Sequence, residues 1–281
     1  MEQQLEQIRE QQRQVWDKFS PGWRKWDTLV MNFMQPMGEE IIQRLRLKET
    51  DNVLDIAGGT GEPGLTIAPI LKKGKVIITD LSEGMLAVAR DNATKKGITN
   101  YETLACDVSE LPFNDGSFDK ISCRMGFMFF PDMLMAAKEM VRVLKPGGII
   151  ATSVWATPDK NPWVTMIMSV INKNLNLPAP PPGAPGMFRC GNPGFIAEIF
   201  RQAGLKNVVE KEITGKLQAV SAENYWNFHN DVAAPIVAAM SKADEATKAI
   251  IKKEVFELVN RKYPDKKTAI DFAAIVISGE K

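Results

Sequence analysis

The sequence predicts an α/β protein with a doubly wound, mostly parallel sheet. Short apolar stretches alternate with helical stretches from residue 52 to residue 155, which is typical of parallel strands joined by right-handed crossovers. A glycine-rich segment, Gly58 to Gly64, follows the first apolar stretch, and the second ends on Asp80. A strand, a glycine-rich turn, a helix and a strand that ends on a carboxylate form the nucleoside-binding half of such a sheet.

Helices are expected before this alternation begins. Residues 2–19 carry Leu5, Ile8, Val15, Trp16 and Phe19 near helical spacing. We expect Ser20-Pro21-Gly22 to break that helix. A second helix is expected over residues 23–46, kinked or divided at Pro36-Met37-Gly38.

The alternating region supplies the central elements, and the pattern loosens after Trp155. Within the region, strands are expected at residues 52–56, 75–80, 101–106, 118–123 and 148–155, and helices at 62–72, 82–97 and 132–145. Beyond it, helices are expected at residues 161–175, 192–203 and 221–263, and strands at 208–213 and 269–278.

Composition narrows the function classes. The chain has 281 residues, with 35 Lys and Arg against 34 Asp and Glu, and this balance argues against sequence-independent binding of nucleic acid. The cysteines Cys106, Cys123 and Cys190 lack the spacing of a metal site, so no metal is expected. No stretch approaches the ~18 apolar residues that would span a membrane. We therefore expect a cytoplasmic protein, and the sequence sets no oligomeric state.

Two nucleoside cofactors compete for the glycine-rich turn. Gly59, Gly61 and Gly64 with Asp80 satisfy the dinucleotide pattern. However, a carboxylate at Asp55 would repel a pyrophosphate at the helix N-terminus, and Pro63 removes one N–H donor. A ligand with a cationic amino group and a sulfonium would instead be attracted by Asp55.

The sequence resembles the class I S-adenosylmethionine (AdoMet) dependent methyltransferases, closest to their ubiquinone/menaquinone C-methyltransferase branch. Four blocks carry the resemblance in register over about residues 50–155: Val53–Gly64 with Asp80, Ala105-Cys106-Asp107, Leu111–Asp119 and Val141–Gly148. One departure is Ala57, where the family often has glycine. A methyl group there is compatible with the turn if the backbone φ angle is negative.

The resemblance implies a Rossmann-like sheet of seven strands, whose last two strands pair as an antiparallel hairpin. About 50 mostly helical residues separate those two strands. We therefore expect an N-terminal helical lid over residues 1–48, an AdoMet-binding core over 49–218 and 267–281, and a helical cap insertion over 219–266. The lid would carry Trp16, Trp23 and Trp26.

The resemblance also implies a set of cofactor contacts. Asp55 would serve the methionine end, Asp80 the ribose hydroxyls, Asp107 and Val108 the adenine, and Met125 would lie under the sulfonium. The full expected set is Asp55, Ala57, Gly58, Gly59, Thr60, Gly61, Asp80, Leu81, Met85, Asp107, Val108 and Met125.

The sequence says less about the site for the methyl acceptor, because methyl transfer requires mainly alignment of the reactants and exclusion of water, for which no residue pattern is specific. Arg124, Phe129 and Trp155 are expected to bind the acceptor. Arg124 would bind an anionic group of the acceptor or pair with a neighbouring carboxylate. The single histidine, His229, is either a general base for a phenol or enol or a packed side chain.

We expect methyl transfer to a mostly apolar small molecule, namely a quinone precursor, a polyketide or a lipid-like phenol, at carbon or oxygen. Two alternatives stay open at this point. One is a nicotinamide-dependent oxidoreductase of Rossmann type, and the other is a non-catalytic AdoMet-binding protein.

Overall fold

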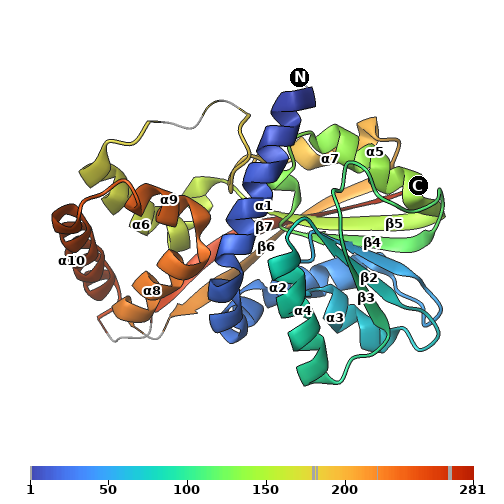
Figure 1. The fold of residues 1–281 in the computed structure, drawn as a ribbon, viewed down its shortest axis with the longest axis horizontal. Coiled ribbons are helices and arrows are strands. Elements are labelled where there is room, and N and C mark those ends of the chain that lie inside the picture. Colours follow the sequence, from blue (N-terminus) through green and yellow to red (C-terminus); the bar gives the residue numbers. More distant parts are fainter. Residues whose placement is uncertain (1, 179–180, 182, 220, 265–267) are drawn as a thin grey trace.

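A seven-stranded sheet with the order β3-β2-β1-β4-β5-β7-β6 forms the core of the protein (Figure 1). The computed structural model describes residues 2–178, 181, 183–219, 221–264 and 268–281. Neighbouring strands from β3 to β5 are parallel, whereas β7 is antiparallel to both β5 and β6. The predicted fold class is confirmed. The strands are β1 (Val53–Ile56), β2 (Val76–Asp80), β3 (Tyr101–Ala105), β4 (Phe118–Arg124), β5 (Leu144–Trp155), β6 (Lys206–Ala219) and β7 (Thr268–Glu280).

Helices cover both faces of this sheet, which is why its central strands β1, β4 and β5 are mostly buried runs rather than alternating ones. In β1, Val53 packs into one apolar cluster with Ile41, and Leu54 packs into a second cluster with Met140. Figure 1 shows α5 and α7 on one side of the sheet and α2, α3 and α4 on the other. These helices are α2 (Asp27–Leu45), α3 (Gly64–Ile67), α4 (Glu83–Lys96), α5 (Met133–Val143) and α7 (Phe195–Gln202).

The first helix, α1, runs unbroken over Glu2–Lys25, so the predicted break at Ser20-Pro21-Gly22 is wrong. Pro21 cannot donate to the carbonyl of Asp17, four residues earlier. The Ser20 hydroxyl donates to that carbonyl instead, at 2.9 Å. Another helix, α8 (Ala222–Val232), packs closely against α1 at Gly22. A Cβ on Gly22 would lie 2.0 Å from the Asp231 carbonyl oxygen, so only glycine fits there without a shift.

The second helix, α2, likewise continues through Pro36 instead of dividing there. Its apolar face is buried at Val30, Phe33, Met37 and Ile41. Pro36 has no N–H to donate within the helix, and the packing of this apolar face against the sheet stabilises the helix across that position. The chain turns between α1 and α2 at Trp26.

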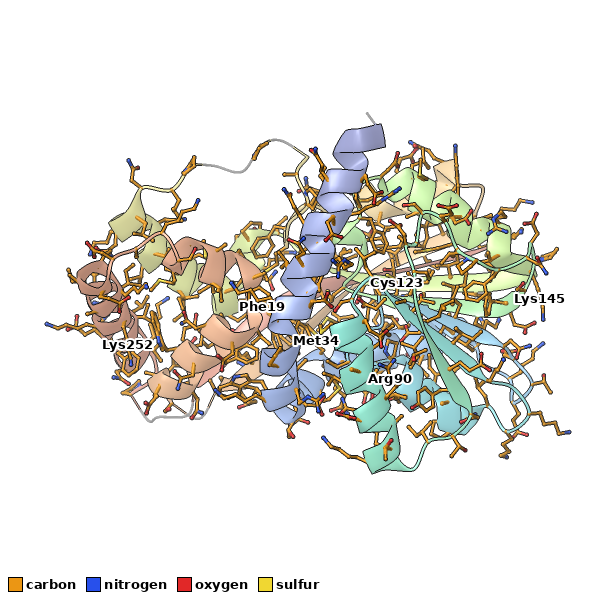
Figure 2. All side chains as sticks on the ribbon, in the orientation of Figure 1. Phe19, Met34, Arg90, Cys123, Lys145 and Lys252 are labelled. Carbon is orange, nitrogen blue, oxygen red and sulfur yellow. The ribbon has the colours of Figure 1, made fainter. Side chains whose placement is uncertain are left out.

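The predicted insertion lies between β6 and β7 and contains α8, α9 (Ala234–Met240) and α10 (Glu245–Lys262). Together with α6 (Pro162–Leu175), these helices form the group on the left of Figure 1. Residues 220 and 265–267, at the two ends of the insertion, lie outside the described residues. Figure 2 shows Met34 and Cys123 within the body of the protein and Lys252 on the outer helix α10.

Two other element predictions need correction. The helix expected over residues 62–72 is only one α-helical turn, α3, followed by a 3-10 turn at Ala68–Ile70. β6 is eight residues longer than residues 208–213, because its many charged side chains lie on an exposed edge and hide the strand pattern. No helix within the described residues is long and apolar enough to cross a membrane.

Candidate active site

A cavity opens at the carboxyl ends of β1, β2 and β4, the place where open α/β sheets bind ligands. Three groups of residues line it: the glycine-rich turn and the ends of the parallel strands, the N-terminal helices, and the helices beyond β5. All predicted cofactor residues except Asp55 and Gly61 lie in its wall, as do Arg124, Phe129 and Trp155.

The turn after β1 is folded onto the neighbouring strands. The Gly58 N–H donates to the Thr79 carbonyl at 3.0 Å, and the Gly61 N–H donates to the Gly58 carbonyl at 2.8 Å. A Cβ on Gly58 would lie 2.5 Å from Ile78, so no side chain fits there. Gly59, Gly61 and Ala57 have φ angles of 56°, 110° and 51°. The condition of a negative φ at Ala57 is therefore not met, and this alanine adopts a conformation typical of glycine.

Asp55 lies beneath the turn, outside the wall of the cavity. Its Oδ2 accepts from the Gly64 N–H at 2.9 Å, and its Oδ1 accepts from the Ser122 hydroxyl at 2.6 Å. The side chain is fully buried, and burial raises the pKa of its carboxyl group to about 7. The structure thus gives Asp55 a role in holding the turn against β4, instead of the expected contact with the methionine end.

Gly61 is also placed differently from the expectation. A Cβ on Gly61 would lie 2.5 Å from the Leu65 side chain and 3.3 Å from Ala89. This glycine therefore faces α4 and the start of α3, whereas Gly59, whose Cβ would have only Met85 nearby at 3.7 Å, faces the cavity.

Asp80 closes β2 at the cavity wall, beside Leu81 and Met85. Its Oδ2 accepts from the Gly59 N–H and its Oδ1 from the Ser82 N–H, both at 2.9 Å. Burial raises the pKa of this carboxyl group to about 6. Each carboxylate oxygen can accept more than one hydrogen bond, so the bonds from Gly59 and Ser82 leave acceptor capacity for a ligand.

At the end of the cavity beyond Asp80 lie Asp107 and Val108. The Asp107 Oδ1 accepts from the Ser109 N–H at 2.6 Å. Its Oδ2 lies 2.8 Å from the Nε of Arg9 on α1. Arg9 lines the cavity, and the sequence offered no signal for it, since arginines are frequent on the exposed face of such a helix.

The end of β4 supplies a second strained position. Met125 has a φ angle of 63°, and its N–H donates to the Ser153 carbonyl at 3.0 Å. Non-glycine residues at positive φ cluster at functional sites, because the surrounding structure must hold them there. Ala57 and Met125 bring two such residues to one cavity.

Aromatic rings line the remaining end of the cavity. The Phe33 ring of α2 stacks on Trp155 of β5 at 5.5 Å and meets Trp163 of α6 edge-on at 4.9 Å. Phe228 of α8 lies 6.5 Å from Phe33. At the α1 side, Trp16 meets Phe129 at 5.1 Å. Phe33 and Trp163 had no signal in the sequence that separated them from core residues.

Glu62, in the glycine-rich segment, also lines the cavity and was not predicted. One oxygen pairs with Lys96, and the other accepts from the Thr66 hydroxyl at 2.6 Å. Its position between two glycines of the motif was the signal that could have indicated it.

His229 does not line the cavity. It is fully buried in α8 among Trp163, Tyr225 and Phe228, and its Nδ1 lies 2.8 Å from the Tyr225 carbonyl oxygen. Burial lowers the pKa of the imidazole to about 4. Of the two roles expected for His229, this placement agrees with that of a packed side chain. It gives no geometric basis for a general base.

Comparison with known proteins identifies the family. The family model described as the ubiE/COQ5 methyltransferase family matches residues 9–165. A demethylmenaquinone methyltransferase of Listeria monocytogenes is 30% identical over 216 residues, which are 71% of this chain and 89% of that protein. A ubiquinone/menaquinone biosynthesis C-methyltransferase of Xanthomonas oryzae is 34% identical over 152 residues, which are 50% of this chain and 58% of that protein.

Solved structures support the fold. The crystal structure of a putative methyltransferase from Bacillus halodurans has a TM-score of 0.56 at 20% sequence identity, and the match covers 87% of this chain and 98% of that one. The family model covers more than half of this chain and includes the glycine-rich turn, Asp80 and the end of β4. The chain belongs to the ubiE/COQ5 methyltransferase family and is an AdoMet-dependent methyltransferase.

Proposed function

We propose that the protein transfers the methyl group of AdoMet to a ring carbon of a reduced quinone precursor. The observation that carries this proposal is the cluster of Phe33, Trp155, Trp163 and Phe228 at one end of the cavity. Such walls suit a flat aromatic ring with apolar substituents. The names of the Listeria and Xanthomonas relatives point to the same class of acceptor.

The cavity fits AdoMet in one direction. Asp80 has acceptor capacity left for the two ribose hydroxyls, and Leu81 and Met85 flank it. Asp107 and Val108 would hold the adenine, and Ala57, Gly58, Gly59, Thr60 and Met125 would surround the methionine and the sulfonium. This arrangement leads the reactive methyl group toward the aromatic end.

When bound, AdoMet supplies a methyl group that its sulfonium activates for in-line displacement. The residues of this chain therefore have two tasks, which are to align the acceptor carbon with that methyl group and to exclude water. Carbon methylation needs an electron-rich ring, so the acceptor is a hydroquinone instead of a quinone. The aromatic walls serve both tasks. As the new carbon–carbon bond forms, the carbon–sulfur bond of AdoMet breaks, S-adenosylhomocysteine leaves, and the ring loses one proton to solvent.

The expected division into lid, core and cap is part of the proposal. Residues 1–48 contribute Arg9, Gln12, Trp16 and Trp23 to the cavity wall, and residues 219–266 contribute Phe228 and Val232 to Pro235. Both parts lie outside the core over residues 49–218 and 267–281. Side chains from both sides of the cavity support closure over the acceptor. We also propose a cytoplasmic location, supported by three cysteines that remain free thiols.

The test is turnover of AdoMet with reduced demethylmenaquinone, followed by mass spectrometry and NMR of the product. We expect one added methyl group on a ring carbon. A Trp155→Leu variant should raise the KM for the acceptor and leave AdoMet affinity unchanged, whereas the exposed Ile250→Ala control should change neither. Methylation at oxygen, or turnover only of unrelated phenols, would contradict the proposal.

A further inference from the structure

Arg124, the last residue of β4, brings a positive charge to the cavity wall. Its side chain is partly buried, and burial lowers the pKa of its guanidinium. Among the residues that the structure describes, none forms an ion pair with Arg124 within 4.0 Å or accepts a hydrogen bond from it. A partly buried guanidinium at a cavity wall, without a protein partner, is available to an anionic group of a ligand.

The nearby carboxylates are already engaged. Glu62, Asp55 and Asp27 act on Arg124 through their charge. Glu62 holds Lys96 and Thr66, Asp55 accepts from Gly64 and Ser122, and Asp27 accepts from the Asn92 amide at 3.0 Å. The sequence left two possible partners for Arg124, a protein carboxylate or an anionic group of a ligand. The engagement of these carboxylates favours the ligand.

The strand places Arg124 beside the glycine-rich turn. Side chains two apart on a strand point to the same face, so Arg124 follows Ser122 on one side of β4. Ser122 donates to Asp55 beneath the turn, and the guanidinium reaches toward α2, with Nη1 3.9 Å from where a Cβ on Gly38 would lie. Asp107, at the proposed adenine end, follows β3 at the outer edge of the sheet, three strands away in the order β3-β2-β1-β4.

We propose that Arg124 binds the α-carboxylate of AdoMet. This carboxylate is the one anionic group of that molecule, and it lies at the end opposite the adenine. A planar guanidinium can hold a carboxylate through two parallel hydrogen bonds. The inference moves Arg124 from the acceptor to the cofactor, and it rests on the proposed orientation of AdoMet in the cavity.

Calorimetry with AdoMet and with decarboxylated AdoMet, on wild type and on Arg124→Met, tests this assignment. Wild type should bind AdoMet more tightly than the decarboxylated form. In Arg124→Met, AdoMet affinity should fall by about 10- to 150-fold, the range for a hydrogen bond to a charged group. Affinity for decarboxylated AdoMet should barely change, so that the variant no longer distinguishes the two ligands.

Three controls keep the result interpretable. Arg201→Met removes an exposed arginine of α7 that pairs with Glu198, and it should leave both affinities unchanged. Arg124→Lys should show an intermediate loss, and it replaces the methionine variant if that variant does not fold. Thermal unfolding of ligand-free Arg124→Met should show no loss of stability, because the variant removes a partly buried charge that has no protein partner.

Three results would overturn the assignment. The first is equal affinity of wild type for the two ligands, and the second is equal weakening of both ligands in Arg124→Met. The third is unchanged AdoMet affinity in that variant, which together with a raised KM for the acceptor would return Arg124 to the acceptor. The binding measurement contains no acceptor, so an error in the proposed acceptor would not affect it.

Discussion

At the scale of single residues, the two strand-end aspartates of the nucleotide-binding motif have different surroundings. Asp55 accepts hydrogen bonds from the Gly64 N–H and the Ser122 hydroxyl and lies outside the cavity wall. Asp80 lies in the wall and accepts from the Gly59 and Ser82 N–H groups. Two carboxylates that look equivalent in the sequence are thus expected to respond differently to substitution.

Asp55→Asn should leave AdoMet affinity unchanged, because an amide can accept from the Gly64 N–H and donate to the Ser122 hydroxyl. Asp80→Asn should weaken AdoMet by at least about tenfold, since it replaces a charged acceptor facing the ligand. Calorimetry on the matched pair measures both. A larger loss in Asp55→Asn than in Asp80→Asn would restore Asp55 to the methionine end.

His229→Gln should leave kcat and its pH profile unchanged, because the imidazole does not reach the cavity. The melting temperature should fall, since the ring packs against Trp163, Tyr225 and Phe228. Steady-state kinetics over a range of pH and thermal unfolding test the two parts. A large fall in kcat that recovers at high pH would instead establish His229 as a base.

At the scale of elements, α1 and α8 are held to their neighbours by specific contacts. Asp17 of α1 accepts from the Ser82 hydroxyl at 2.6 Å and from the Gly84 N–H at 3.1 Å, at the start of α4. Asp231 of α8 accepts from Lys25 and from the Trp26 indole, both at 2.7 Å. The proposed lid therefore touches both the core and the proposed cap.

Gly22→Ala should lower the free energy of unfolding by about 1–3 kcal/mol, because the added methyl group would meet the Asp231 carbonyl. Helix propensity alone predicts the opposite sign, a gain of about 1 kcal/mol. Chemical denaturation distinguishes the two. Gly186→Ala, where the nearest atom would be 3.9 Å away, is the control and should cost nothing from crowding.

Asp17→Ala should loosen α1 from α4 and speed the dissociation of AdoMet by about tenfold, as expected for lost hydrogen bonds to a carboxylate. Hydrogen exchange along α1 should rise in parallel. Glu10→Ala is the matched control, because Glu10 bonds only Arg13 and Gln14 within α1. Unchanged dissociation in Asp17→Ala would mean that α1 does not gate the cofactor.

At the scale of the whole molecule, two buried carboxyl groups near the glycine-rich turn make stability depend on pH. The pKa values of Asp55 and Asp80 are raised to about 7 and about 6 by burial, from an ordinary 3.8. The folded protein therefore binds more protons than the unfolded chain between these values. The two raised pKa values therefore stabilise the folded protein fully below pH 3.8, and this stabilisation is lost as the pH rises through about 6 and about 7.

The ligand-free protein should accordingly become more stable as the pH falls from about 8 to about 5. His229, whose pKa is lowered from 6.5 to about 4, opposes this trend below about pH 6.5, but the two aspartates together outweigh one imidazole. Asp119 and Glu139, whose pKa values are lowered, oppose it only near and below their ordinary values of 3.8 and 4.5. Denaturation curves at several pH values measure the trend. Asp55→Asn should flatten it, and an unchanged slope in that variant would assign the dependence to other groups.

Much of the core was predictable because its signals are local. The glycines at 58, 59 and 61 reflect the backbone conformation of the turn, and the apolar runs that end on aspartates reflect buried strands. Both features can be recognised from residues that are adjacent in the sequence. The unbroken α1 was not predictable, because the Ser20 hydroxyl replaces the missing donor of Pro21 only once the helix exists. The length of β6 was hidden by charged side chains on an exposed edge.

The sequence by itself determined the sheet, the turn and the cofactor class, since each depends on short segments with strong conformational preferences. Tertiary structure alone decided which polar side chains face the cavity. It placed Asp55, Gly61 and His229 behind the wall and left Arg124 in it without a protein partner. The physical reason is that burial and pairing of a charge depend on contacts between segments far apart in the chain, and no local pattern encodes them.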